Sequence, residues 1–244
     1  MRPGGWARLL DRVLPPACPG CLGPLAVPSD PLCARCRLRL APLPWPRCDR
    51  CGVPRGTGAE GLPCRECAGW PASLAWARSA VAFDGPAVRL VHGLKYQGWW
   101  RVADLMAAHM APLLAGVRGV LVPVPTTPGR ARIRGYNQAE LIARKLSLEA
   151  GLDVFDVLER APARRSQVAL PRLERMANVV QAFRVRSAAR SGLRGAELIL
   201  VDDVLTTGAT AAAVAGALSR AGLARLAIVT FARTLPPGAR ATPP

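Results

Sequence analysis

The sequence has almost no lysine, few acidic residues and no long uncharged hydrophobic run. Only Lys95 and Lys145 are lysines among 33 basic residues, which face 16 acidic ones. No stretch of about 18 uncharged apolar residues occurs, so no membrane span is predicted. Asp11 and Arg12 interrupt the short apolar run near the N-terminus, which therefore does not fit a signal peptide. We expect a cytoplasmic protein.

Arginine supplies nearly all of the positive charge. With two lysines among 33 basic residues, 31 are arginines, and the formal net charge is +17. A guanidinium group binds phosphate through two N–H donors at once. A GC-rich genome also favours arginine codons, but that bias leaves the net charge unexplained. A field of this sign attracts polyanions, such as nucleic acid, an anionic membrane surface or a pyrophosphate-bearing substrate, and their binding should depend on salt.

The eight cysteines form four C-x-x-C pairs at regular spacing. Each pair places two thiolates on one side of a tight turn, and two such turns complete the tetrahedral shell that Zn²⁺ prefers. Four copies at this spacing favour zinc over disulfides or a redox pair in a reducing compartment. Since four thiolates leave no open position, both sites should be structural. A crossed pairing is the alternative to the contiguous one, which groups Cys18, Cys21, Cys33 and Cys36 at one zinc and Cys48, Cys51, Cys64 and Cys67 at the other.

The pattern changes near residue 70, which divides the chain into two parts. Residues 1–70 are rich in proline, glycine and cysteine and are expected to form a double zinc ribbon with a short helix over residues 6–14. Residues 71–234 are expected to form one α/β domain, and residues 235–244, with four prolines, a disordered tail.

Strands and helices alternate along the second part. The predicted strands are 75–83, 119–124, 154–160, 197–201 and 226–231, and the predicted helices are 87–94, 102–114, 137–150, 172–180 and 209–221, with an extended segment at 183–185. This alternation predicts a parallel sheet with helices on both faces.

The stretch LILVDDVLTTGAT, residues 198–210, predicts a buried strand, a loop of small residues and a helix. Such a loop presents N–H groups at the positive end of the helix, and threonine hydroxyls add donors, so a phosphate monoester fits there. Acids at the end of the strand can accept hydrogen bonds from ribose hydroxyls. An ordinary capped helix after two acids is the alternative. The predicted ribose-phosphate site comprises Asp202, Asp203, Thr206, Thr207, Gly208, Ala209 and Thr210.

This stretch resembles the phosphoribosyl pyrophosphate signature of type I phosphoribosyltransferases. With the ribbon pattern, the segments 122–146 and 165–183 resemble more narrowly the ComF/GntX family of competence-associated proteins, and the resemblance covers nearly the whole chain. It implies a type I phosphoribosyltransferase-like fold, a catalytic and ribose-binding role for Asp202 and Asp203, and a 5′-phosphate site at residues 206–210. It also implies Mg²⁺ bound with the pyrophosphate, and single-stranded DNA and competence proteins as partners.

Basic residues outside this stretch are candidates for binding the pyrophosphate. Arg130, Arg132 and Arg134 follow the predicted strand 119–124 on a glycine-bearing loop, where they would form a mobile anion clamp. A solvated basic loop is the alternative. Lys95 matches the lysine position of the family and is a further candidate.

The two histidines and a pair of tryptophans lie outside the predicted ligand site. His92 and His109 lie in helical patterns, where a packing role is favoured, and they are given no catalytic role. Trp99 and Trp100 would either stack on a base or serve as packing anchors.

The sequence is compatible with two functions. The first is transfer of a phosphoribosyl group to an unidentified acceptor. The second is a non-catalytic sensor of the same ligand that binds single-stranded DNA during transformation. Residues 160–194 carry nine arginines and one acid, which suits a DNA-binding face but also a solvated surface.

Overall fold

The structure is a computed structural model that describes residues 16–40, 42–59, 61–160, 183–186, 195–222 and 225–236. The helix predicted at 6–14, the helix predicted at 172–180, most of the basic segment 160–194 and residues 237–244 of the predicted tail lie outside the described residues. Within the described ranges, no helix has both the length and the apolar character needed to cross a bilayer.

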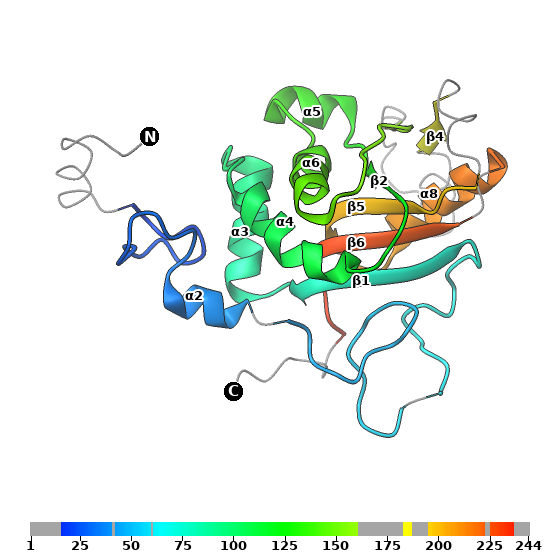
Figure 1. Ribbon diagram of the computed structural model, residues 1–244, viewed down its shortest axis with the longest axis horizontal. Helices are drawn as coiled ribbons and strands as arrows, with labels where there is room; N and C mark the ends of the chain where they lie inside the picture. The colour runs from blue at the N-terminus through cyan, green and yellow to red at the C-terminus, as the bar shows by residue number, and fades with distance from the viewer. Residues whose placement is uncertain are drawn as a thin grey trace, which may run out of the picture.

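A four-stranded parallel sheet forms the centre of the protein (Figure 1). Its strands lie in the order β1 (Leu74–Ala82), β6 (Leu226–Arg233), β5 (Leu198–Leu205) and β2 (Val120–Pro123). In the middle of the sheet, Leu198 lies opposite both Val120 and Leu226. Strands buried on both faces need continuous apolar runs, and the sequences of β5 and β6 contain such runs. The predicted parallel sheet is confirmed.

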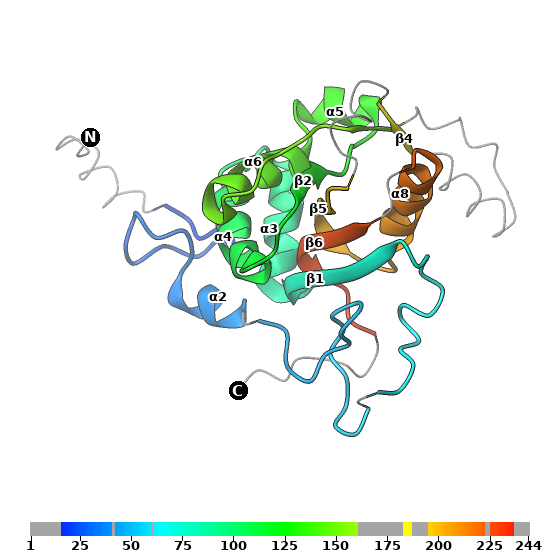
Figure 2. The ribbon, with the colours of Figure 1, turned by 45° about the vertical axis from the view of Figure 1, so that its right-hand side comes forward.

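Helices cover both faces of the sheet. Figure 2 shows one group of helices on one side and a single helix on the other, namely α3 (Gly85–Tyr96), α4 (Val102–Met110) with the 3-10 helix η1 (Ala111–Leu114), and α6 (Gln138–Ala150), against α8 (Ala209–Arg220). Successive residues of a strand point to opposite faces. Accordingly Ile199 and Val201 join the hydrophobic cluster under α3, α4 and α6, while Leu198 and Leu200 join the cluster under α8.

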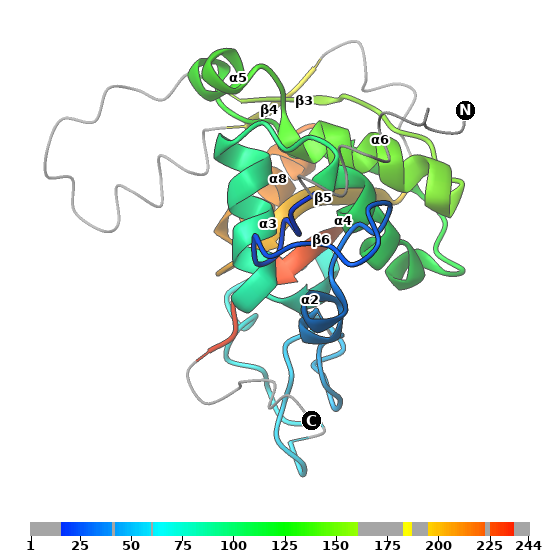
Figure 3. The same ribbon diagram turned by 90° about the vertical axis from the view of Figure 1, so that its left-hand side faces the viewer.

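A second, two-stranded sheet lies apart from the first. It pairs β3 (Leu158–Arg160) antiparallel with β4 (Phe183–Val185), and Figure 3 shows both strands near the helix that follows β2. The single strand predicted over 154–160 is therefore only partly correct. Val154 makes one isolated bridge to Leu121 of β2, after which the chain leaves the main sheet and pairs with β4 instead.

Two helices were not expected from the sequence. The arginines after β2 lie on α5 (Pro128–Arg134), where a mobile loop was predicted. The Thr127 hydroxyl accepts a hydrogen bond from the Arg130 amide, Pro128 occupies the first turn, and Gly135 ends the helix in the left-handed conformation. The proline and glycine that suggested a loop are thus the start and stop signals of a short helix. The other is α2 (Ala34–Arg39), which begins directly after Cys33.

Candidate functional site

The cysteines gather in two tetrads, each contiguous in sequence. All sulfur atoms within a tetrad lie within 4.8 Å of one another, in the groups Cys18, Cys21, Cys33, Cys36 and Cys48, Cys51, Cys64, Cys67. The Sγ atoms of Cys51 and Cys64 are 3.7 Å apart and those of Cys48 and Cys67 3.9 Å apart. Such separations exceed a disulfide bond of about 2.05 Å and match four thiolates about 2.3 Å from one tetrahedral Zn²⁺. The tetrads fit two structural zinc ions, and the crossed pairing does not occur.

The thiols of one tetrad differ in acidity because they share a small space. Burial raises the pKa of Cys48, but hydrogen bonds from the Cys51 and Arg50 amides outweigh it and lower that pKa to about 7. Burial and the charge of Cys48 raise the pKa of Cys67 to about 11. One thiolate therefore forms easily and disfavours the next, and a divalent cation relieves this repulsion by replacing the protons.

The two tetrads pack against opposite sides of the sheet. Cys18 and Cys36 belong to the hydrophobic cluster that contains α3 and α4, and Figure 1 shows the segment that carries them, from residue 16 to the end of α2, on the side of α3. Cys51 and Cys67 belong to the cluster that contains α8. Gly20 allows close approach within the first tetrad, since a Cβ atom there would lie 2.9 Å from the Cys36 sulfur.

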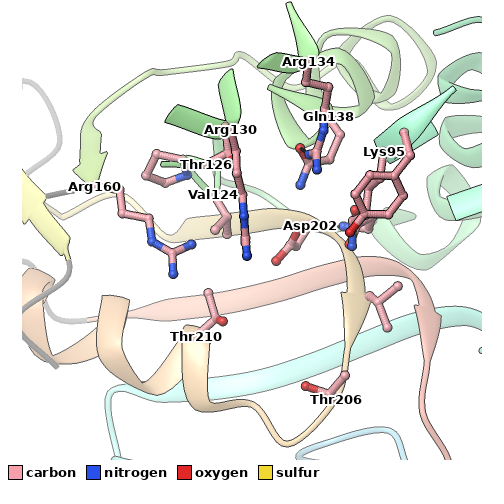
Figure 4. A pocket seen from close by; sticks show the side chains of 14 residues that line it. Lys95, Val124, Thr126, Arg130, Arg134, Gln138, Arg160, Asp202, Thr206 and Thr210 are labelled. Atoms are coloured by element: carbon pink, nitrogen blue, oxygen red, sulfur yellow. Dashed lines mark hydrogen bonds and ion pairs between the residues drawn. The ribbon is translucent and has the colours of Figure 1, made fainter. Parts of the chain in front are cut away.

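A basic cleft of about 220 Å³ opens at the carboxyl ends of β2 and β5 (Figure 4). After β2 the chain continues through α5 to α6 on one face of the sheet, and after β5 it passes to α8 on the other. In open α/β sheets, ligands bind at the carboxyl ends of neighbouring strands whose following helices lie on opposite faces of the sheet. The cleft is lined by Lys95, Tyr96, Val124, Pro125, Thr126, Arg130, Arg134, Gln138, Arg160, Asp202, Asp203, Val204, Thr206 and Thr210.

The two acids lie within β5 and have different surroundings. The Asp203 side chain is 3% exposed, and its Oδ1 atom accepts a 2.8 Å hydrogen bond from the Lys95 ammonium. Its Oδ2 atom is buried and has no hydrogen-bond partner among the described residues. Asp202 is half-buried at the cleft wall, and its Oδ1 atom accepts a hydrogen bond from the Asp203 amide. Burial and the charge of Asp203 raise the pKa of Asp202 to about 7.

The loop between β5 and α8 spans residues 206–208 and is termed the phosphate loop, after the phosphate site that the sequence predicts there. Gly208 adopts the left-handed conformation with φ of +79° and starts α8, and the Thr207 hydroxyl accepts a hydrogen bond from the Ala209 amide. Thr206 and Thr210 line the cleft (Figure 4). Thr207, Gly208 and Ala209, which the sequence also placed in the site, do not line it; Gly208 shapes the turn, and α8 directs its N-terminal end toward the cleft.

The predicted arginine clamp is only partly brought to the cleft. Arg130 and Arg134 line it, whereas Arg132 is exposed and does not. Arg160, at the end of β3, also lines the cleft and was not predicted as a site residue. Burial and the charge of Arg130 lower the pKa of Arg160, and the charge of Asp202 opposes that effect. No local pattern in the sequence indicates this position, because Arg160 is placed by the pairing of β3 with β4, which is distant along the chain.

Residues of the segment RGYNQA, 134–139, mainly hold together the elements that surround the cleft. The Tyr136 hydroxyl donates to the Leu94 carbonyl, at 2.5 Å, and the Asn137 side-chain amide donates to the Val124 carbonyl, at 3.2 Å. The guanidinium of Arg134 donates to the Gln138 side chain and lies 5.4 Å from the centre of the Tyr96 ring. These contacts tie the start of α6 to α3 and to β2.

The remaining aromatic candidates lie outside the cleft. Trp99 packs so tightly on Gly93 that a Cβ atom there would lie 2.0 Å from the ring, which favours a packing role. Trp100 is 53% exposed, with the Arg101 guanidinium 5.4 Å from its ring centre. Neither His92 nor His109 lines the cleft.

Fold and site together define an α/β protein whose parallel sheet carries a basic cleft and whose N-terminal region holds two cysteine tetrads. Residues 9–68 match the double zinc ribbon domain. The chain is 30% identical to the DNA utilization protein YhgH of Salmonella typhi over 236 residues, covering 91% of this chain and 99% of the relative. It is 25% identical to competence protein F of Haemophilus influenzae over 231 residues, 88% and 96% of the two chains. It is also 24% identical to competence protein ComFC of Bacillus subtilis over 196 residues, 76% and 77% of the two chains. The chain belongs to the ComF family.

Proposed function

We propose that the cleft binds phosphoribosyl pyrophosphate, or a closely related ribose phosphate, together with Mg²⁺. The proposal rests on one observation: two acids of β5, the start of α8 and four basic side chains face one cavity. The basic side chains are Lys95, Arg130, Arg134 and Arg160. These groups match a ligand that carries vicinal hydroxyls, which pair with acids, and a phosphate and a pyrophosphate, which pair with the helix start and the basic side chains.

Each part of the ligand has a counterpart in the cleft. The Asp202 carboxylate, half-buried at the cleft wall, would accept hydrogen bonds from the ribose hydroxyls. The 5′-phosphate would lie at the start of α8, where Thr206 and Thr210 offer hydroxyls beside the helix N-terminus. Arg130 and Arg160 would bind the pyrophosphate through paired N–H donors.

The acids also fit a magnesium ion carried by the ligand. Partial burial and the charge of Asp203 raise the pKa of Asp202 to about 7, and a nearby cation would favour its ionised form. Mg²⁺ keeps several waters and binds mainly to substrate phosphates, so one or two carboxylates suffice. When bound, the ion would neutralise charge on the pyrophosphate.

A transferase reaction would use the same arrangement. An acceptor nucleophile would form a bond to C1 of the ribose while the C1–oxygen bond to pyrophosphate breaks, and pyrophosphate would leave with the electron pair. Arg130, Arg160 and Lys95 would stabilise the developing negative charge on the leaving group. The proton released by the acceptor would pass to an ionised carboxylate, for which Asp202 is placed at the cleft wall.

Calorimetry with phosphoribosyl pyrophosphate and Mg²⁺ tests the binding proposal. We expect saturable binding by the wild-type protein and none detectable in Asp203→Ala. Release of pyrophosphate on addition of candidate acceptors would show transfer, and Asp203→Ala should abolish it. Binding without release of pyrophosphate in the presence of any acceptor would indicate a ligand sensor. No binding at all would contradict the proposal.

The second candidate function is handling of single-stranded DNA during uptake. It is supported by the relatives, one named for DNA utilization and two for competence, and by the nine arginines of residues 160–194. Competence proteins would then be partners. Filter binding of an oligonucleotide at several salt concentrations tests it, because an interface built on phosphate contacts loses affinity steeply as salt rises. An affinity that hardly changes with salt would count against it.

A further inference from the structure

Trp70 lies between the second cysteine tetrad and the phosphate loop. Its indole N–H donates to the Thr207 carbonyl at 3.2 Å. The ring lies against Gly208, where a Cβ atom would come within 2.5 Å of it. Trp70 itself is nearly buried, at 9% exposure. A residue close to Cys67, the last cysteine of the second tetrad, therefore contacts the turn at which α8 begins.

The backbone around Trp70 is held by the second tetrad. The Trp70 amide donates to the carbonyl of the zinc ligand Cys67 at 3.1 Å. The Arg50 guanidinium, from the turn between Cys48 and Cys51, donates to the carbonyls of Cys67 and Trp70 at 3.2 and 3.1 Å. The order of this short segment thus depends on the tetrad keeping its shape.

A second connection reaches the other end of the phosphate loop. Arg233, at the end of β6, is 1% exposed and donates to the Cys51 carbonyl at 2.7 Å. In the sheet it lies opposite Leu205, the last residue of β5 before the loop, and the Thr234 amide donates to the Leu205 carbonyl. Both ends of the loop are therefore fixed by residues that contact second-tetrad ligands.

The contact with Trp70 decides the direction of one loop amide. In a trans peptide the carbonyl and the following N–H point in opposite directions. Because the Thr207 carbonyl faces Trp70, the Gly208 N–H faces away from it. The left-handed conformation of Gly208 and the nearby ring also leave no room for a side chain at this position.

The first tetrad has a different environment. Cys18 and Cys36 pack in the cluster of α3 and α4, on the opposite face of the sheet from the Trp70 cluster. In the part of the chain that the structure describes, no hydrogen bond joins the first tetrad to residues 206–210. The chain therefore offers a built-in comparison between two chemically equal metal sites.

We propose that Trp70 is a positioning residue through which zinc in the second tetrad holds the phosphate loop in its ligand-binding shape. The first tetrad has no such effect. The effect on ligand affinity rests on the proposed function, whereas the effect on the loop itself does not. On this view the second ribbon supports the loop that borders the cleft as well as stabilising the fold.

Hydrogen exchange of the loop amides in the unliganded, zinc-loaded protein tests the contact directly. In Trp70→Ala we expect the amides of residues 206–210 to exchange about tenfold faster or more, because the loop opens more often, while amides of β5 keep their protection. Trp70→Phe, which keeps a ring but loses the N–H donor, should give a smaller change. Trp45→Ala is the matched control, since Trp45 is 75% exposed. Equal exchange in Trp70→Ala and wild type would overturn the proposal.

Ligand variants of the two tetrads separate the metal sites. Cys64→Ser removes a ligand from the second tetrad and Cys33→Ser one from the first, and both cysteines are partly exposed. With zinc content measured in each, we expect faster exchange at residues 206–210 in Cys64→Ser only. Equal acceleration in both variants would mean general loosening and would contradict a specific link.

Affinity for phosphoribosyl pyrophosphate with Mg²⁺ completes the test. Trp70→Ala should bind about tenfold more weakly than wild type, with zinc content unchanged, since it loses a hydrogen bond and ring packing at the loop. If the wild type fails to bind, the proposed function is wrong and the exchange results still decide the role of Trp70. If Trp70→Ala exchanges faster yet binds like wild type, the coupling between loop order and ligand binding is wrong.

Discussion

The Lys95 ammonium at the end of α3 lies 2.8 Å from Oδ1 of Asp203 in β5, joining two elements that are far apart in sequence. Asp203 is almost fully buried, so loss of its partner would leave an uncompensated charge. Lys95→Met should therefore lower the free energy of unfolding by roughly 2 kcal/mol, less than for a fully enclosed pair because Lys95 is partly exposed. Urea unfolding near neutral pH measures this.

Lys145 is the matched control for that prediction. It is the only other lysine, and it pairs with Asp104 at 2.7 Å where both side chains are well exposed. Lys145→Met should change the free energy of unfolding by less than about 1 kcal/mol. Equal effects of the two substitutions would show that the buried position of Asp203 does not matter.

The raised pKa of Asp202 predicts a pH-dependent contribution to stability. Burial and the charge of Asp203 raise this pKa from 3.8 to about 7, so the folded protein holds a proton that the unfolded chain has released between these values. Where the folded state binds more protons, stability falls as pH rises. The contribution of Asp202 is thus fully present below its unfolded pKa and is lost by the time pH passes about 7.

Asp202→Asn should remove this part of the pH dependence. Urea unfolding of zinc-loaded wild type and variant at about pH 5.5 and about pH 8 gives the comparison. We expect the variant to gain stability relative to wild type at the higher pH. A constant difference between the two proteins across this range would show that Asp202 titrates near its ordinary value.

The parts of the site that are contiguous in sequence could be predicted from it. Asp202, Asp203, Thr206 and Thr210 follow one another along a strand, a loop and a helix start, so local pattern alone brings them together. Arg160 could not be found in this way, because it reaches the cleft only through the antiparallel pairing of β3 with β4. Such a pairing depends on tertiary contacts that have no local periodicity.

The same distinction explains where the predicted fold differed from the structure. Strand β6 is buried on both faces and forms an uninterrupted apolar run, so it was predicted closely. Strand β5 begins with such a run but continues to Leu205, past the predicted end at residue 201, and so contains the two acids that were expected to follow it. Helix α5 has no buried residues, and its start and stop signals are the proline and glycine that equally suggest a loop. An exposed short helix of this kind leaves almost no hydrophobic periodicity to detect.

Metal analysis should find close to two zinc ions per chain after anaerobic purification. The sulfur separations of 3.7 to 3.9 Å suit tetrahedral thiolate coordination. Removal of zinc by a chelator should lower the thermal midpoint markedly, because thiolate sites supply folding energy to small modules with little core. A metal-free protein with four disulfides would contradict the assignment of both tetrads.

The placement of the arginines predicts which of them bind the pyrophosphate. Arg160 lines the cleft beside Arg130, whereas Arg132 lies exposed on α5 and does not face the cavity. Arg160→Ala should weaken binding of phosphoribosyl pyrophosphate with Mg²⁺ by at least about tenfold, since a charge-assisted hydrogen bond contributes about 1.5 to 3 kcal/mol. Arg132→Ala removes an equal charge from the same region and controls for the general field of the protein. Calorimetry of both variants at two salt concentrations separates direct contact from that field. Salt screens long-range interactions, so a loss of affinity that comes from the field alone becomes smaller as salt rises. Equal weakening in both variants would mean that the cleft attracts its ligand by net charge alone and that the position of Arg160 at its wall has no specific role.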